Sequence, residues 1–316
     1  MYKKSFGLTS SPFSPHPDPR FLFLTPHIEE ALDCLTYGIL SRDGFVLVTG
    51  EVGTGKTTIV NTLLRWLRGR QMPTSFVFNS RLDADQFLEF MMADFGISCE
   101  GRSKSQLLLC LNQWLLARYR AGQTPVLIVD EAQNLSAEAL EEVRLLTNLE
   151  TGTEKLLQIV LVGQPELEYK LKRPELRQLL QRITLRVKTH RLTQEETAKY
   201  IEQRLHIAGA NGRRIFQPEA VPSIHEYSRG IPRLVNLICH HSLVSAFANR
   251  QESVSPEIVE RVAGEFELPG PVSSALVSDT RCDNMDLQQA IRLLADVADK
   301  LHRSRQHLLE ERKTFL

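Results

Sequence analysis

Residues Gly50 to Thr57 read GEVGTGKT and directly follow the apolar run Phe45 to Thr49. A strand, a GxxxxGK[ST] turn and a helix in this order are typical of a phosphate-binding loop. Glycines at these positions let backbone N–H groups converge on an anion at the N-terminus of the following helix. Lys56 is expected to reach the terminal phosphates, and the hydroxyl of Thr57 suits Mg²⁺. The sequence thus predicts a nucleoside triphosphate in contact with Gly50, Glu51, Val52, Gly53, Thr54, Gly55, Lys56, Thr57 and Thr58.

Asp130 and Glu131 follow the aliphatic run Val126 to Val129. Hydrolysis of a bound triphosphate needs a carboxylate that helps to hold Mg²⁺ and a group that orients the attacking water. Asp130 suits the first task and Glu131 the second. An acidic pair that merely ends a strand is the simpler alternative, and the presence of Lys56 favours the catalytic interpretation. Because no Asn-Lys-x-Asp guanine motif occurs in the sequence, ATP with Mg²⁺ is the predicted ligand.

Gln164 and Arg233 are further candidates for the same site. Gln164 follows an aliphatic run, and the carboxyl end of such a strand faces the ligand crevice of a doubly wound sheet. Its amide could contact the γ-phosphate or align the water, or it could simply cap a loop. Arg233 follows Gly230-Ile-Pro at a predicted helix start. It could contact the γ-phosphate from a mobile lid, or form a salt bridge within that lid.

Positive charge concentrates between residues 170 and 191, where Glu175 is the single acidic residue. Three interpretations compete: a solvated helix face, salt-sensitive contact with DNA phosphates, and an arginine that reaches the nucleotide of a neighbouring subunit. For the last role Arg182 is the first choice, because it precedes a β-like stretch, and Arg177 is the reserve. The cluster consists of Lys170, Lys172, Arg173, Arg177, Arg182, Arg186, Lys188 and Arg191.

The elements expected around these motifs are short aliphatic runs that alternate with helical stretches up to about residue 190. Largely aliphatic runs, such as 126–129 and 156–162, indicate parallel strands buried on both faces. Beyond them only helical signals remain, beginning with the capping box Thr193-Gln-Glu-Glu196. The predicted fold is an α/β P-loop sheet with helices on both faces, then a small all-helical lid and a C-terminal helix. The predicted parts are an N-terminal segment without regular structure (1–25), the P-loop core (26–190), the lid (191–267), a linker (268–284) and an amphipathic helix (285–316).

Composition narrows the classes of protein. The 316 residues include 38 basic and 38 acidic ones, so any contact with nucleic acid must be local. The five cysteines lack metal-ligand spacing and are expected to be small buried residues in a reducing compartment. No apolar run approaches the roughly 18 residues that span a bilayer, and the first residues lack a secretory signal. A helicase is disfavoured, because it needs a second nucleotide-binding half where this sequence is helical.

The order of GEVGTGKT, DEAQ (130–133), VGQPEL (162–167), LLQRI (179–183) and GIPR (230–233) resembles the AAA+ ATPases of the general secretion pathway protein A (ExeA-like) group. The segments 6–21 and 37–39 are similar to that group as well, and the resemblance covers about residues 2 to 262. It implies ATP hydrolysis by a ring or transient oligomer, with Gln164 as sensor 1, Arg182 as the arginine finger and Arg233 as sensor 2. It also implies that segment 1–25 and the lid enclose the adenine.

Members of this group energise or assemble bacterial envelope secretion, exopolysaccharide-export or pilus systems, and the resemblance implies such a role and such a partner here. The founding members continue into a membrane span and a cell-wall-binding domain, whereas this sequence ends after one predicted helix. We therefore expect a cytoplasmic protein that meets the inner membrane through a partner. The apolar seam of helix 285–316 either docks that partner or a second copy, or packs on its own body. An ATP-dependent DNA-transposition regulator of the TniB/MuB kind is the alternative function, and a nucleotide-switched scaffold with negligible turnover is a third.

Overall fold

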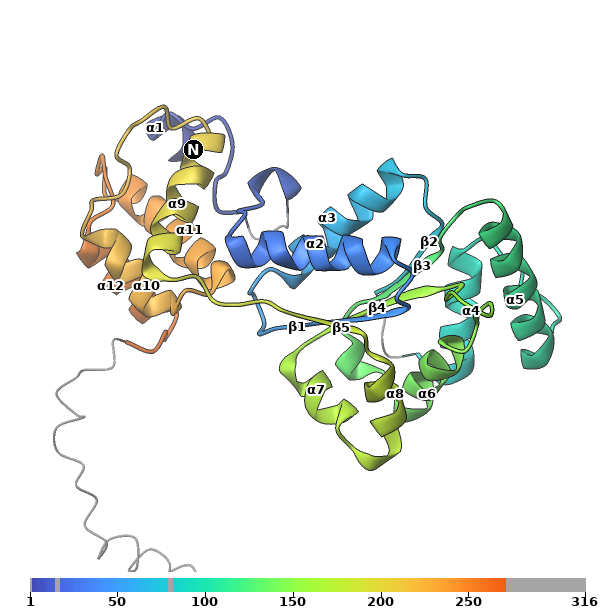
Figure 1. Cartoon of the computed structure of the whole chain (residues 1–316). Helices are drawn as coiled ribbons and strands as arrows, with labels where there is room; N and C mark the ends of the chain where they lie inside the picture. The colour runs from blue at the N-terminus through green and yellow to red at the C-terminus, as the bar shows by residue number, and fades with distance from the viewer. Residues whose placement is uncertain (1, 15–17, 79–81, 271–316) are drawn as a thin grey trace, which may run out of the picture. The chain divides into compact units, whose positions relative to one another are not determined.

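The computed structural model describes residues 2–14, 18–78 and 82–270 (Figure 1). Within them, strands form a 5-stranded parallel sheet in the order β2-β3-β4-β1-β5. The first strand in sequence, β1, therefore lies between β4 and β5, away from both edges. The strands are β1 (Phe45–Thr49), β2 (Thr74–Val77), β3 (Val126–Val129), β4 (Gln158–Gly163) and β5 (Leu185–Lys188).

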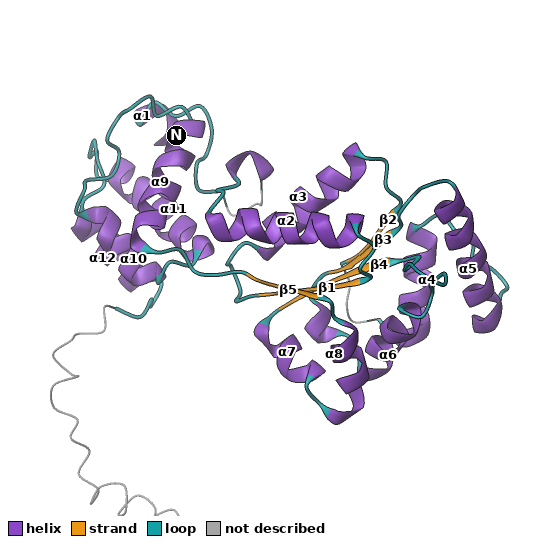
Figure 2. Ribbon diagram, in the orientation of Figure 1, coloured by secondary structure: helices purple, strands orange, loops and turns teal. Residues whose placement is uncertain are grey.

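Both faces of the sheet are covered by helices, as Figure 2 shows. Successive side chains of a strand point to opposite faces, so a strand buried on both sides must be apolar throughout. Val46 and Val48 pack on one face with α2 and α3, whereas Phe45 and Leu47 pack on the other with α4 to α8. The helices are α2 (Pro26–Leu40), α3 (Lys56–Gly69), α4 (Ala84–Asp94), α5 (Lys104–Arg120), α6 (Ala137–Leu146), α7 (Pro165–Leu171) and α8 (Arg177–Arg182). Short 3₁₀ turns, η2 (Ala132–Asn134) and η3 (Pro174–Leu176), lie among them.

The residues after β5 build a helical region with its own hydrophobic core. We call this region the lid; it consists of α9 (Gln194–Ile207), α10 (Ala220–Ser228), α11 (Pro232–Ala248) and α12 (Pro256–Glu265). The predicted capping box at the start of α9 is present, with Thr193 accepting from the N–H of Glu196 and the Glu196 side chain accepting in return. Sheet and lid lie within one compact unit that ends at Leu268.

The N-terminal segment is part of the lid core. Phe6, Leu8 and Phe13 are buried among lid side chains, and the N–H of Thr9 donates to the carbonyl oxygen of Ala208 across 2.8 Å. The expectation that segment 1–25 lacks regular structure is wrong at two places: α1 (Tyr2–Ser5) and the 3₁₀ turn η1 (Pro19–Phe21). Both are too short to carry a periodic apolar signal, which explains why the pattern did not show them.

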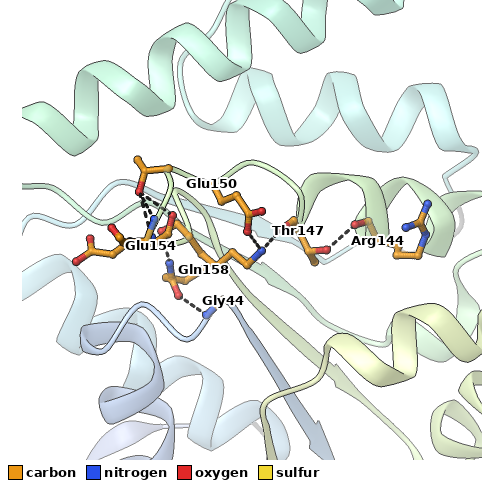
Figure 3. A network of polar contacts seen from close by, with 9 residues as sticks. Gly44, Arg144, Thr147, Glu150, Glu154 and Gln158 are labelled. Atoms are coloured by element: carbon orange, nitrogen blue, oxygen red, sulfur yellow. Dashed lines mark hydrogen bonds and ion pairs between the residues drawn. The ribbon is translucent and has the colours of Figure 1, made fainter.

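A polar network at the amino ends of β1 and β4 fixes the segment that joins α6 to β4 (Figure 3). The side chain of Gln158 accepts from the N–H of Gly44 across 2.8 Å and donates to the carbonyl oxygen of Lys155 across 3.0 Å. The ammonium of Lys155 in turn donates to the carbonyl oxygen of Thr147 across 2.9 Å. Gly44 must be glycine, because its φ is +93° and a Cβ there would lie 2.7 Å from Cγ of Lys155. These contacts lie at the amino ends of the strands, and none of them involves the carboxyl ends.

The structure describes no residue after residue 270. The linker beyond residue 270 and the amphipathic helix 285–316 lie outside the described residues. Within the described ranges, no helix combines the length and apolar character needed to cross a membrane. Of the four cysteines described, Cys239 is buried as expected, whereas Cys34, Cys99 and Cys110 are half-buried on the flanks of their helices and loops.

Candidate functional site

The phosphate-binding loop leaves the carboxyl end of β1 and runs directly into α3. Gly53 and Gly55 adopt φ values of +84° and +102°, which side chains other than glycine rarely tolerate. Gly55 forms the N-cap of α3 without a side chain, so the first N–H groups of the helix remain available. The glycines of the loop thus have the backbone conformations that the predicted anion-binding turn requires.

Lys56 begins α3 and is 7% exposed. Its ammonium donates to the carbonyl oxygens of Gly50 and Glu51 across 2.7 and 2.9 Å, so the side chain folds back along the loop. Burial lowers the pKa of Lys56, and the charges of Glu131 and Asp130 oppose that shift. The Lys56 ammonium therefore lies near enough to Glu131 and Asp130 for their charges to act on it.

Gly50 allows a second close approach within the loop. A Cβ at this position would stand 1.7 Å from Oγ1 of Thr189, which follows β5. Thr189 and Thr54 share a hydrogen bond of 2.6 Å between their hydroxyls, and Thr54 also donates to the carbonyl oxygen of Glu51 across 2.8 Å. The loop is therefore fastened to the strand that lies beside β1.

Asp130 and Glu131 stand at the carboxyl end of β3, as predicted. Asp130 is 8% exposed, and its Oδ1 accepts from the N–H of Glu131 across 2.9 Å. Burial raises the pKa of Asp130, and the neighbouring charge of Glu131 adds to the effect. A cation would relieve this buried carboxylate, which is the fit that a Mg²⁺ site requires. Glu131 adopts a left-handed backbone conformation with φ +51°.

Gln164 and Gln133 both contact the Glu131 side chain. Nε2 of Gln164 donates to Oε2 of Glu131 across 3.1 Å, and Nε2 of Gln133 donates to the same oxygen. Gln164 was expected at the site from the sequence, whereas no role was expected for Gln133. The position of Gln133 two residues after Glu131 was the available signal, but its direction depends on a backbone angle that the sequence does not reveal.

A cavity of about 660 Å³ opens over the loop. Lys56, Thr57 and Glu131 line it, and so does Arg233 from the start of α11. The N-terminal segment and the lid supply most of its remaining wall, through Phe13, Asp18, Phe21, Phe23, Tyr200, Arg204, Asn236 and His240 among others. Phosphate-binding groups at one part of the wall and aromatic side chains at another suit a nucleotide, which has an anionic end and an aromatic base.

Arg204 joins the two parts of that aromatic wall. Its buried guanidinium donates from Nε to the carbonyl oxygen of Pro12 across 2.6 Å and from Nη1 to the hydroxyl of Tyr200 across 2.8 Å. It also lies 4.7 Å from the ring centre of Phe21. The Tyr200 hydroxyl donates to Oδ1 of Asn236 across 3.1 Å, which links α9 to α11. This cluster was not anticipated from the sequence, because Pro12 and Arg204 are 192 positions apart.

Arg233 reaches the loop through its backbone. Its N–H donates to the carbonyl oxygen of Gly53 across 3.2 Å. Among the described residues its guanidinium has no ion-pair partner, so the salt bridge considered as the alternative is not formed there.

Arg182 and Arg177 do not line this cavity. Both are exposed on α8, and Arg182 stands close enough to Glu150 for its charge to help Lys155 lower the pKa of that carboxyl. Arg182 precedes β5, whereas the phosphate loop follows the carboxyl end of the parallel strand β1. The structure therefore separates Arg182 from the nucleotide site of its own chain.

Three members of the basic cluster pair with or donate to other residues of the same chain. Arg191 pairs with Glu51 at 2.5 Å, Lys188 pairs with Glu168 at 3.3 Å, and Lys170 donates to the carbonyl oxygens of Gln133 and Leu135. Fewer cations are thus free for an external anion than the sequence indicates.

Comparison with known proteins agrees with this geometry. A family model described as "AAA domain" matches residues 39–171, which run from the end of α2 through the loop, the acidic pair and α7. Residues 39–171 are thus similar to an AAA domain. Over 259 residues, or 80% of the chain, it is 43% identical to general secretion pathway protein A of Aeromonas hydrophila, which confirms the resemblance expected from the motifs. The match spans 46% of that protein, so this chain covers less than half the length of its relative.

Solved structures confirm the AAA fold. Cdc6p of Pyrobaculum aerophilum is similar with a TM-score of 0.62 and 20% identity, over 81% of this chain and 70% of that one. The ORC1 protein of Aeropyrum pernix is similar with a TM-score of 0.58 and 19% identity, over 81% and 69%. At such identities the likeness concerns the fold alone.

Proposed function

We propose that this protein binds ATP with Mg²⁺ and hydrolyses it, and that turnover drives or assembles a bacterial envelope secretion, exopolysaccharide-export or pilus system. One observation carries the proposal: Lys56, Thr57 and Glu131 line a single cavity at the carboxyl ends of the strands. In open parallel sheets this is where ligands bind.

The loop residues 50–58 hold the phosphates in this proposal, with their N–H groups and the Lys56 ammonium as donors. Thr57 and Asp130 would hold Mg²⁺, and the ion would supply positive charge beside the phosphate oxygens. Glu131 accepts the proton of the attacking water, a task worth about 10²- to 10⁴-fold in rate. Gln164 and Arg233 contact the γ-phosphate, and the N-terminal segment and the lid enclose the adenine.

Arg182, with Arg177 as the reserve, serves the nucleotide of a neighbouring copy in this proposal. Its place beside Glu150 and away from the cavity supports a role between subunits rather than within one. A homo-oligomer, as a ring or one formed with ATP, follows from that role.

The role in secretion rests on the 43% identity to general secretion pathway protein A. The partner and the place at the inner membrane are proposals of the same kind, and segment 285–316 is the part of the chain that we propose for docking. The DNA-transposition alternative is less favoured, because Arg191, Lys188 and Lys170 of the basic cluster have partners within the chain.

Nucleotide binding and phosphate release by the purified full chain test the enzyme function. We expect Lys56→Ala to abolish binding of a fluorescent ATP analogue, and Glu131→Gln to keep binding while phosphate release falls by about 10²- to 10⁴-fold. A wild-type protein that retains no adenine nucleotide, or a Glu131→Gln variant as fast as the wild type, would refute hydrolysis at this site.

Genetic complementation tests the cellular role. A strain lacking the gene should fail to assemble or operate its envelope system, and the wild-type gene should restore it while the Lys56→Ala form does not. Deletion of 285–316 should abolish recruitment of the partner and spare ATP turnover. Restoration by Lys56→Ala would remove nucleotide from the role, and unchanged recruitment would remove the docking segment.

A further inference from the structure

Gln133 bonds to two residues of the proposed catalytic site at once. Its Nε2 donates to Oε2 of Glu131, and its Oε1 accepts from the backbone N–H of Gln164 across 3.0 Å. Because Nε2 of Gln164 donates to the same Glu131 oxygen, the two amides converge on one atom of the carboxylate. Gln133 therefore closes a ring of hydrogen bonds that joins the turn after β3 to the turn after β4.

The surrounding backbone is built for this contact. Gly163, the last residue of β4, has no side chain, and a Cβ there would stand 2.9 Å from Oε1 of Gln133. The ammonium of Lys170 on α7 donates to the carbonyl oxygens of Gln133 and Leu135. The turn 131–135 is thus held against α7 through its backbone carbonyl oxygens as well as through the Gln133 side chain.

Glu131 needs such support. Its φ of +51° is a conformation that residues other than glycine adopt only when their surroundings impose it. With both donors on Oε2, the second oxygen, Oε1, accepts no hydrogen bond from any residue that the structure describes. Glu131 lines the cavity, so Oε1 is the carboxylate atom left to receive a proton.

We propose that Gln133 is a positioning residue for ATP hydrolysis: it holds Oε2 of Glu131 so that Oε1 takes the proton of the attacking water. This inference rests on the proposed ATPase function. In the step it serves, the water oxygen bonds to the terminal phosphorus as the bond to ADP breaks. The electron pair of the broken bond leaves with ADP, and the water proton passes to Oε1.

Three variants separate this role from a merely structural one. Gln133→Met keeps the length of the side chain and removes both polar contacts, whereas Gln133→Glu keeps an acceptor for the N–H of Gln164 and removes the donor to Glu131. The matched control is Asn134→Ala, because Asn134 is exposed in the same 3₁₀ turn and does not line the cavity. Each full-length variant is measured for kcat, KM, affinity for a fluorescent ATP analogue, and Tm.

We expect kcat to fall about 10- to 100-fold in Gln133→Met and at least as much in Gln133→Glu, as for other small misplacements of a reacting group. KM and nucleotide affinity should stay within about twofold, and Asn134→Ala should match the wild type. Wild-type kcat in Gln133→Met, or a fall in kcat matched by loss of nucleotide affinity and Tm, would overturn the positioning role alone. Absence of phosphate release from the wild type would instead overturn the ATPase function, and this inference with it.

Discussion

The backbone N–H of Arg233 donates to the carbonyl oxygen of Gly53 across 3.2 Å, so the first turn of α11 rests on the phosphate-binding loop. Side-chain atoms of Arg233 and Ile231 come within 2.7 and 3.1 Å of the point where a Cβ at Gly53 would stand. A nucleotide that reshapes the loop must therefore move α11 with it or break this contact. The lid is in this way mechanically connected to the ligand before any lid side chain touches it.

Replacing Gly53 by alanine should loosen this junction. The new methyl group meets Arg233 and Ile231, and φ +84° strains any residue other than glycine. Gly55→Ala is the matched control, because Gly55 is strained at φ +102° but has no atom within 4 Å of a new Cβ. Strain alone should cost both variants about 1–3 kcal/mol, whereas Gly53→Ala should in addition increase protease cleavage in the lid. Equal cleavage of the two variants would show that the contact does not restrain the lid.

Because Thr189 lies close to Gly50, a larger residue at position 50 should destabilise the protein by steric clash rather than by backbone strain. Gly50→Ala places a methyl group 1.7 Å from Oγ1 of Thr189 and should cost about 1–3 kcal/mol in the free energy of unfolding. Thr189→Ala alone should cost about 1 kcal/mol, because it removes the 2.6 Å hydrogen bond to Thr54. The double variant should be more stable than the sum of the two losses predicts, as measured by urea denaturation. Strict additivity would contradict the clash.

Arg204 should be required for the N-terminal segment to stay on the lid. Arg204→Met leaves the carbonyl oxygen of Pro12 without its buried donor, which should cost about 2 kcal/mol and expose segment 2–14 to proteases. Arg214→Met serves as the control, because Arg214 is exposed and its loss should change stability by less than about 0.5 kcal/mol. The two variants are compared by denaturant titration and by limited proteolysis. If segment 2–14 is cleaved no faster in Arg204→Met, other contacts hold the segment.

The buried carboxyl of Asp130 gives the free protein a pH-dependent weakness. Burial raises its pKa above the usual 3.8, so the folded state binds this proton more tightly than the unfolded state. Ionisation as the pH rises through that window therefore lowers the free energy of unfolding. Asp130→Asn keeps an acceptor for the N–H of Glu131 and should be more stable than the wild type at neutral pH without Mg²⁺ or nucleotide. The difference should shrink as the pH falls toward 3.8, and its persistence there would assign it to another cause.

The strands of the sheet were predictable because the apolar character of a buried strand can be read directly along the sequence. Strands covered on both faces are apolar at nearly every position, as the run before Asp130 is throughout and the run before Gln164 is from Ile159 onward. The order of the strands could not be obtained in the same way, since each apolar run can pair with any other. Strand ends differ by a residue or two, as for the run 156–162, whose strand is Gln158–Gly163.

The site divides along the same line. Lys56 and Glu131 each lie in a short contiguous motif, and each was named as a candidate because the spacing within such a motif indicates where its side chains lie. Gln133 was missed as a functional residue because its contact with Glu131 depends on a left-handed φ that the sequence does not announce. Arg204 was missed because a single arginine in α9 gives no sign that Pro12 lies against it.

The insertion of Phe6, Leu8 and Phe13 into the lid core has a consequence for biosynthesis. Thr9 and its partner Ala208 are 199 positions apart, so segment 6–13 leaves the ribosome long before its binding site exists. Those aromatic and aliphatic side chains must stay exposed while the entire sheet is translated, a period in which chaperones or wrong partners can capture them. Completion of the lid helices, rather than of the sheet, is then the event that buries segment 6–13.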